Sequence, residues 1–394
     1  MAMTRRDRFL GICRFDRPGD LYINDGFWSQ TLKEWIKQGA PENIWDPAFR
    51  ADYFQFSPGL HTPGLLDIRS GLSYSRGKRI DVGKGLKLMD YGIPPTVPSH
   101  EPELIDEDDR TMTVVNAAGQ TLKFLKGDTG NMPMFIDWPV KDRQTWNEYK
   151  KRLDPHTPER WPEDWDACVA YVNSLDVPVG LQIGGFFGYM REWVGSERVL
   201  YMFYDDPNLI EEMMDQMLYM EMEIVKRVAK DIKIDIALYW EDMCYKAGPL
   251  ISPDMVRRFM VPRYKRMTEL LHENGVEFTY LDSDGNIEAL IPIWLECGIN
   301  YLWPFEVAAG NDVVAVRKEY GKDLIIAGAI DKRALAKGKD AIKEEVYSKV
   351  PFLLEEGGYF PSTDHAVPPD VSLEDYQYYI NTMREVAGLG KIFF

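Results

Sequence analysis

The second half of the chain alternates between short apolar segments and longer helical patterns. Each apolar segment is rich in β-branched or aromatic residues and ends in polar residues, and a helical stretch follows most of them. The segments are residues 177–185, 234–243, 276–284, 299–306, 323–330 and 359–365. Strands that alternate with helices pair in parallel, and an earlier strand is expected at residues 20–24. The pattern therefore predicts an α/β fold, a (β/α)8 TIM barrel.

The expected helices begin with clear capping signals. Asp206 and Ser252 stand directly before the helical patterns of residues 207–230 and 253–275, and Ser372 stands before the last one. Such side chains accept hydrogen bonds from free N–H groups of the first helical turn. These positions predict where three of the helices between the strands begin.

Residues 66–140 do not follow this alternation. Residues 109–124 form two runs of alternating polar and apolar residues joined by a short turn, which predicts a β-hairpin. We interpret residues 66–140 as a β-rich insertion, a cap that leans over one end of the barrel. No linker or internal repeat divides the chain, so residues 1–394 are expected to form a single barrel domain that contains this insertion.

Composition excludes several classes of partner. The 46 Lys and Arg residues stand against 63 Asp and Glu residues, a net charge of −17, whereas nucleic acids and anionic membranes attract basic surfaces. Cys13, Cys168, Cys244 and Cys297 lie far apart and are expected to be free thiols of a reducing compartment. No apolar run approaches the roughly 18 residues that cross a bilayer. We therefore expect a cytoplasmic protein without nucleic-acid or membrane partners.

The strand ends hold the candidate functional residues, because the active site of a (β/α)8 barrel lies at the C-terminal ends of its strands. These ends are rich in carboxylates and include one histidine and two tryptophans. The residues are Gly184, Gly185, Trp240, Glu241, Asp242, Asp282, Ser283, Asp284, Gly285, Trp303, Glu306, Asp331, Asp364 and His365. Asp282 and Asp284 are two positions apart, so both can face the same side of a strand.

Two kinds of chemistry suit such carboxylates, and a structural role stays open beside them. If Asp282 and Asp284 converge near His365, the group can bind a divalent ion, or it can raise the pKa of one carboxyl and make a general acid. Any single acidic residue here can equally cap a helix or occupy a turn. The convergent set favours a functional role, because mutual repulsion makes a chance cluster of carboxylates costly.

At residues 282–292 the sequence DSDGNIEALIP resembles the fifth-strand signature of the uroporphyrinogen decarboxylase superfamily. The flanking segments are similar to that superfamily as well, namely SPDMVRRFMVPRYKRMTELLHENG and LECGINYLWPFEVAAG. So are GGYFPSTDHAVPPDVSLEDY near the end of the chain and DRFLGICRFDRP near its start. The resemblance implies the barrel fold and either of two chemistries, decarboxylation or corrinoid-dependent methyl transfer.

The resemblance favours the methyltransferase branch. Uroporphyrinogen decarboxylases carry an arginine-rich, RQAGRY-like segment that binds substrate carboxylates, whereas residues 20–29 here, DLYINDGFWS, contain no arginine. Thiol-methylating members of the other branch hold zinc with a His-x-Cys pair and a later Cys. The matching positions here are Asp282, Asp284 and the Asp364–His365 pair. Carboxylate and imidazole ligands make a harder site, which suits an ether oxygen better than a thiol.

We therefore expect an O-demethylase-type methyltransferase that moves a methyl group from a small methoxylated, aromatic compound to the Co(I) of a partner corrinoid protein. The expected catalytic residues are Asp284, Glu241 and His365, and the expected substrate-binding residues are Trp240, Trp303 and Asp242. The expected ligands of a metal ion such as zinc are Asp282, Asp284, His365 and Glu241.

Two alternatives remain open at this stage. The first is a lyase that decarboxylates a smaller acid, which would need cations at the pocket that the strand ends do not offer. The second is a barrel that binds a corrinoid or another tetrapyrrole without catalysis, having lost its metal site through the change from His-x-Cys to Asp-x-Asp.

Overall fold

The computed structural model describes residues 3–57, 79–81, 87–89, 96–126 and 132–394. Its centre is a parallel six-stranded sheet with the strand order β14-β13-β12-β11-β8-β7. The strands are β7 (Gly180–Gly184), β8 (Ile236–Trp240), β11 (Phe278–Asp282), β12 (Tyr301–Trp303), β13 (Ile325–Ile330) and β14 (Tyr359–Thr363). Each strand lies inside one of the six predicted segments. The predicted α/β fold with a parallel sheet is confirmed.

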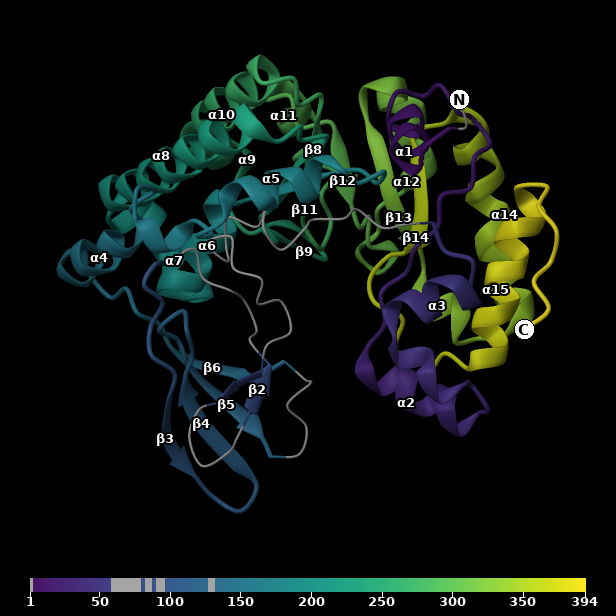
Figure 1. Cartoon of the computed structure of the whole chain (residues 1–394), viewed down its shortest axis with the longest axis horizontal. Helices are drawn as coiled ribbons and strands as arrows, with labels where there is room; N and C mark the ends of the chain where they lie inside the picture. The colour runs from purple at the N-terminus through teal and green to yellow at the C-terminus, as the bar shows by residue number, and fades with distance from the viewer. Residues whose placement is uncertain (1–2, 58–78, 82–86, 90–95, 127–131) are drawn as a thin grey trace.

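Helices follow the strands and cover the outer side of the sheet (Figure 1). They are α6 (Phe186–Val194), α7 (Ser196–Asp205), α8 (Pro207–Asp231), α9 (Pro253–Met255), α10 (Val261–Glu273), α11 (Ile291–Glu296), α12 (Val313–Tyr320), α13 (Lys332–Leu335), α14 (Lys339–Glu356) and α15 (Leu373–Val386). A π-helical turn, Val256–Met260, joins α9 to α10. Asp206, Ser252 and Ser372 each accept a backbone N–H from the first turn of the helix they precede, as predicted.

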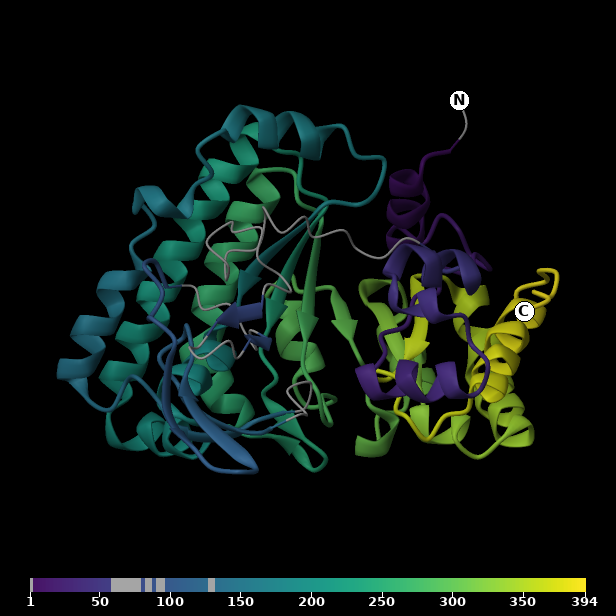
Figure 2. The same cartoon turned by 60° about the horizontal axis from the view of Figure 1, so that its bottom comes forward.

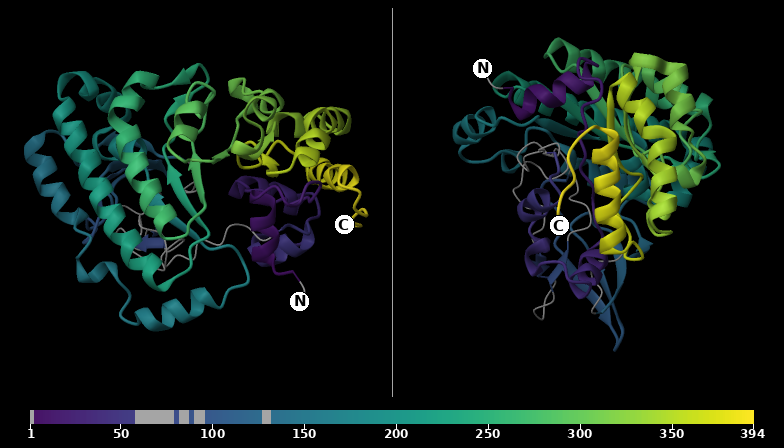
Figure 3. Two further views of the ribbon diagram at one scale, coloured as in Figure 1. Left: turned by 90° about the horizontal axis from the view of Figure 1, so that it is seen from above. Right: turned by 90° about the vertical axis from the view of Figure 1, so that its right-hand side faces the viewer.

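The N-terminal segment forms three helices, α1 (Arg5–Cys13), α2 (Ser29–Lys37) and α3 (Pro47–Tyr53). Figure 2 shows these helices beside the C-terminal ones, and Figure 3 shows α14 and α15 packed side by side. The sheet separates two apolar layers because successive side chains of a strand point to opposite faces. Ile236 and Leu238 of β8 pack with Phe9 of α1 on the inner face, whereas Ala237 and Tyr239 pack against the surrounding helices.

The N-terminal segment runs beside β14 at the edge of the sheet. Asp25 accepts hydrogen bonds from the backbone N–H and the hydroxyl of Thr363, at 2.6 and 2.9 Å, and Phe27 forms a parallel bridge with Val367. Residues 20–24, which were predicted to form a strand, carry no regular strand pairing with any residue that the structure describes. Within the described residues, β7 has no neighbour on its other side. The sheet therefore fits a TIM barrel, but its closure into eight strands is not shown.

The region that interrupts the alternation contains an antiparallel sheet of β3 (Glu103–Glu107), β4 (Thr111–Val115), β5 (Thr121–Leu125) and β6 (Met134–Asp137). β4 and β5 form the hairpin expected at residues 109–124. Gln120 donates to the backbone and side chain of Glu192, and the Val140 N–H donates to the Trp193 carbonyl. These contacts attach the sheet to α6. Much of the remaining insertion lies outside the described residues, and its role as a cap stays a prediction.

Six further short helices and strands in the described part of the chain lie between these elements. They are β1 (Arg79–Asp81), β2 (Lys87–Met89), α4 (Arg143–Tyr149), α5 (Trp165–Asn173), β9 (Cys244–Tyr245) and β10 (Gly248–Pro249). The four cysteines are unpaired, as expected. None of the helices described is both long and apolar enough to cross a membrane.

Candidate active site

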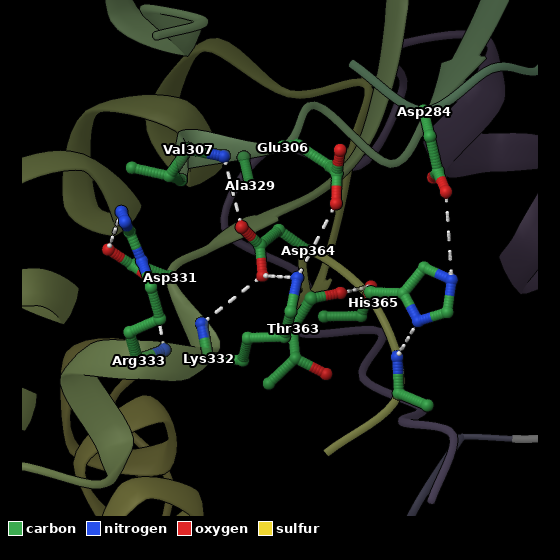
Figure 4. Close-up of polar contacts among 12 residues, drawn as sticks. Asp284, Glu306, Val307, Ala329, Asp331, Lys332, Arg333, Thr363, Asp364 and His365 are labelled. Atoms are coloured by element: carbon green, nitrogen blue, oxygen red, sulfur yellow. Dashed lines mark hydrogen bonds and ion pairs between the residues drawn. The ribbon is translucent and has the colours of Figure 1, made fainter. Parts of the chain in front are cut away.

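The ends of β11 and β14 bring two of the predicted site residues together. Oδ2 of Asp284 lies 3.9 Å from Nε2 of His365 (Figure 4). Two other strands, β12 and β13, lie between β11 and β14 in the sheet. The pair therefore spans the concave side of the sheet at its C-terminal edge, which is where a (β/α)8 barrel places its active site.

Neighbouring groups fix the imidazole of His365. The backbone N–H of Ala366 donates to its Nδ1 over 2.8 Å, so the proton of the neutral ring sits on Nε2, the nitrogen that faces Asp284. Burial lowers the pKa of His365, and the nearby Lys332 charge lowers it further. The rings of Trp28 and Trp303 lie 6.2 and 6.1 Å from the imidazole ring. His365 is therefore a neutral, oriented group at neutral pH.

Asp284 has the properties of a general acid. Burial is the main cause that raises its pKa to about 7, and the negative charges of Asp242 and Glu306 raise it further. Lys332 and Arg191 act in the opposite direction. Oδ1 of Asp284 is buried, and no group of the described residues donates a hydrogen bond to it. A carboxyl with a pKa near the working pH is present in both protonation states, as proton transfer requires.

Glu241 directly follows the end of β8, as predicted, and its side chain contacts the start of α6. Its side chain is fully buried, and its carboxylate accepts the backbone N–H groups of Phe186, Phe187 and Gly188, at 2.7 to 3.1 Å. The Tyr264 hydroxyl donates to it as well, at 2.6 Å. A carboxylate at a helix N-terminus binds these otherwise free donors. Glu241 therefore caps α6, which does not fit the catalytic and metal-binding roles predicted for it.

Of the four predicted metal ligands, the structure brings Asp284 and His365 together. Asp282 ends β11, and its carbonyl accepts the N–H groups of Glu241 and Asp242. Within the described part of the chain, no three His, Cys, Asp or Glu side chains form a group that could hold a metal ion. Asp284 and His365 supply two donors, and Glu241 is occupied by α6. The described side chains do not fit the predicted zinc site.

Among the predicted substrate-binding residues, Trp240 and Asp242 contact a cation that the sequence did not reveal. Arg191 of α6 donates to the Asp242 carboxylate and to its carbonyl, both at 2.7 Å, and its guanidinium lies 5.1 Å from the centre of the Trp240 ring. Asp242 has a φ of 43°, a strained backbone conformation that is common at functional sites. These two residues form one edge of the site.

A second cation lies at the opposite edge of the site. Lys332, the first residue of α13, places its Nζ 3.2 Å from Asp364 and 3.6 Å from Glu306 (Figure 4). The expectation that no cation reaches the strand ends is therefore wrong. Lys332 comes two residues after the end of β13, next to Asp331, so the strand-end rule could have found it. Arg191 lies within α6, and only the folded structure brings it to β8.

Below this polar rim, the concave side of the sheet contains an aromatic cavity of about 180 Å³. Its lining residues are Phe9, Tyr22, Asn24, Tyr280, Tyr301, Trp303, Ala327, Phe360, Pro361 and Ser362. Trp303, which was predicted to bind substrate, lines this cavity and also contacts the His365 ring. The cavity is smaller than the pockets that hold drug-sized ligands, which span about 300 to 1,000 Å³. Its size and walls suit a small molecule with an apolar or aromatic part.

Comparisons with known proteins agree with this fold. Residues 110–386 match the family described as Uroporphyrinogen decarboxylase (URO-D), which is more than half of the chain. A solved methyltransferase from Methanosarcina mazei superposes with a TM-score of 0.53 and 14% identity, over 97% of this chain and 99% of that one. A B12-independent methionine synthase from Shewanella sp. W3-18-1 gives a TM-score of 0.37 and 13% identity, over 57% and 65%. A search of curated proteins finds no match.

Proposed function

The chain belongs to the uroporphyrinogen decarboxylase family, and on this premise we propose that it is a methyltransferase. It would move a methyl group from a small methoxylated aromatic compound to the corrinoid of a partner protein. The observation that carries the proposal is the Asp284–His365 pair, which Trp303 connects to an aromatic cavity. The fold shared with the Methanosarcina mazei methyltransferase supports it.

The leaving oxygen of an aryl methyl ether explains why an acid is needed. When the C–O bond breaks, the electron pair stays on the oxygen, and a phenolate is a poor leaving group unless it receives a proton. Asp284 has a pKa of about 7, mainly because it is buried, so it can supply that proton near neutral pH. The Nε2–H of His365 faces the carboxylate that remains and stabilises its charge. The corrinoid supplies the nucleophile that accepts the methyl group.

The cavity supports an aromatic substrate. Tyr280 and Tyr301 contact each other with ring centres 5.1 Å apart, and Tyr301 stacks on Phe360 at 5.3 Å. Rings arranged in this way bind another ring through edge and face contacts. Because Trp303 joins the cavity to His365, a ring held there would place its methoxy oxygen near the acid.

An anaerobic assay tests this function directly. The purified protein is incubated with reduced cobalamin and a panel of methoxybenzenes, while the cobalt absorbance and the released phenol are followed. We expect the absorbance to change and a phenol to appear with at least one donor. If no donor reacts, the assay is repeated with a corrinoid protein from the same source. Failure there as well would contradict methyl transfer.

One observation favours a second candidate, the decarboxylation of a small acid. Arg191 and Lys332 stand at the two edges of the site, and cations of this kind fix substrate carboxylates. Both are paired with carboxylates of the protein itself, which leaves less charge for a substrate. Release of CO2 from small aromatic or aliphatic acids, with no reaction of any methyl donor, would favour this candidate.

A further inference from the structure

We infer that Lys332 binds a negatively charged oxygen of the molecule that occupies the site. In the proposed methyl transfer this oxygen is the one that loses the methyl group, which would make Lys332 a further catalytic residue. The catalytic part rests on the proposed function. The binding of an anionic oxygen does not, and it can be measured without any methyl transfer.

A buried carboxylate holds Lys332 in place. Asp364 is completely buried and accepts three hydrogen bonds, from the backbone N–H of Val307 at 3.0 Å and from the backbone N–H and Nζ of Lys332, both at 3.2 Å. A buried charge needs such partners to be stable. Because the same residue is held through its backbone and its side chain, the ammonium group has a defined position at the end of β13.

The ammonium group still has donors to offer. It has three N–H donors, and within the described residues only the bond to Asp364 is short enough to be a hydrogen bond. Glu306 lies 3.6 Å away, which is an ion pair but too long for a hydrogen bond. The Lys332 side chain is 22% exposed, so it faces open space at the rim. A charged oxygen entering that space can accept a hydrogen bond from it.

Lys332 also lies within electrostatic reach of the reacting pair. Burial mainly sets the shifted pKa values of Asp284 and His365, and the Lys332 charge contributes to lowering both. Glu306 connects the two sides of the site, because its carboxylate accepts the N–H of Gly285, which follows Asp284, and also faces Lys332 (Figure 4). Glu306 therefore lies between the segment that carries the acid and the cation.

This placement gives the two groups different tasks in the proposed reaction. The methyl carbon leaves with the incoming nucleophile, and the electron pair of the broken C–O bond stays on the oxygen. Asp284 gives a proton to that oxygen. Lys332 keeps its own proton and donates a hydrogen bond, so it stabilises the negative charge before the proton arrives. A substrate carboxylate is the other anionic oxygen that could occupy the same position.

The first test uses 4-nitrophenol, whose ionised form absorbs visible light. Its ionisation when bound is measured against pH for the full chain, for Lys332→Met and for Lys337→Met, a control at an exposed lysine just beyond α13. We expect the natural protein and Lys337→Met to bind the ionised form about tenfold more tightly than Lys332→Met does, because a hydrogen bond to a charged group is lost. Equal binding by all three proteins would overturn the inference.

Two further experiments address a variant that does not fold and the choice between a phenolate and a carboxylate. Removal of Lys332 leaves Asp364 buried without its cation, so a double variant, Lys332→Met with Asp364→Asn, replaces the single one if that does not fold. Benzoate is then added as a competitor. If benzoate displaces nitrophenolate only when Lys332 is present, the position also takes a carboxylate. If benzoate does not compete, the position selects a phenolate oxygen.

The last arm separates this inference from the proposed function. With methyl donors of increasing leaving-group basicity, the rate loss of Lys332→Met should increase, because a more basic oxygen needs more stabilisation. A uniform loss for all donors would contradict the catalytic part. If no donor reacts but Lys332 still governs nitrophenolate binding, the assignment of Lys332 stands and the proposed methyl transfer fails.

Discussion

Asp284 and Glu241 are two carboxyl groups at neighbouring strand ends, both with a pKa raised to about 7 mainly by burial. Their surroundings differ. Glu241 is fully buried and accepts four hydrogen bonds, three of them from α6. The Asp284 side chain is 36% exposed, and one of its oxygens is buried without a hydrogen bond from any described residue. A shifted pKa alone therefore does not identify a reactive group. Only a carboxyl that is partly exposed and not held by a set of hydrogen bonds can exchange a proton with a substrate.

The largest effect that tests this comparison is expected at Asp284. Asp284→Asn keeps the size of the side chain but removes the proton donor, so methyl transfer should fall by about 10²- to 10⁴-fold. Unfolding in urea should change little, because no hydrogen bond in the described part of the chain depends on Oδ1. Asp370→Asn, at an exposed position in the loop after β14, serves as the control. A variant with normal rates would exclude Asp284 as the acid.

The second prediction concerns Glu241. Glu241→Ala leaves three N–H groups of α6 and the Tyr264 hydroxyl without their acceptor, so the free energy of unfolding should fall by about 3 kcal/mol. Glu241→Gln keeps an acceptor oxygen and should cost about 1 kcal/mol. Urea denaturation measures both, and the rate per folded molecule should stay close to normal in Glu241→Gln. If Glu241→Gln instead abolished activity in a stable protein, Glu241 would be a reactive group and not only a cap of α6.

A third prediction uses the pH dependence of the rate. The acid must be protonated, so activity should decrease as the pH rises through about 7, the pKa of the mainly buried Asp284. Asp242→Asn removes a negative charge that raises this pKa, so the decrease should move to lower pH. Arg191→Met removes a positive charge and should move it to higher pH. Shifts of up to about one unit are expected from such neighbours. Shifts in the same direction in both variants would contradict this account.

Stability should also change in this pH range. Burial raises the pKa of Glu241 from 4.5 to about 7, so between these values the folded protein binds more protons than the unfolded chain. The contribution of Glu241 to the free energy of unfolding is complete below the pKa of the unfolded state. It is lost as the pH rises through the pKa of the folded state. The urea midpoint should therefore decrease from pH 5 to pH 8, and less so in Glu241→Gln. An equal decrease in both proteins would assign the change to other groups.

The smallest effect is expected at Trp28. Its ring stacks on His365, and an aromatic contact of this kind contributes about 1 kcal/mol. Trp28→Leu should lower the free energy of unfolding by that amount. It should also let the pKa of His365, which burial lowers, rise towards its ordinary value, because water gains access to the ring. Titration of His365 by NMR measures this, with Trp28→Phe as the conservative control. An unchanged pKa in Trp28→Leu would show that other groups bury the imidazole.

The strands and the convergence of Asp284 with His365 could be predicted from sequence because both follow from local rules. Apolar segments alternate with helices, and active sites lie at strand ends. The direction of the Glu241 side chain could not be predicted from sequence, because it depends on how closely α6 approaches β8. A side chain at Gly185 would bring its Cβ within 2.0 Å of the Trp240 carbonyl oxygen, and one at Gly188 within 2.5 Å. The two glycines allow that approach, and their role is visible only once the strands are in place.

The attachment of the N-terminal segment to the end of the sheet has a consequence for the order of folding. Asp25 is bound by Thr363, the Thr31 hydroxyl donates to the Val367 carbonyl, and the Trp35 indole donates to the Val371 carbonyl. These partners are separated by more than 330 residues, and contacts between distant residues form slowly. A ribosome releases the first partner of each pair long before the second. Residues 25 to 35 can therefore form these contacts only after residues 363 to 371 have been synthesised, near the end of translation.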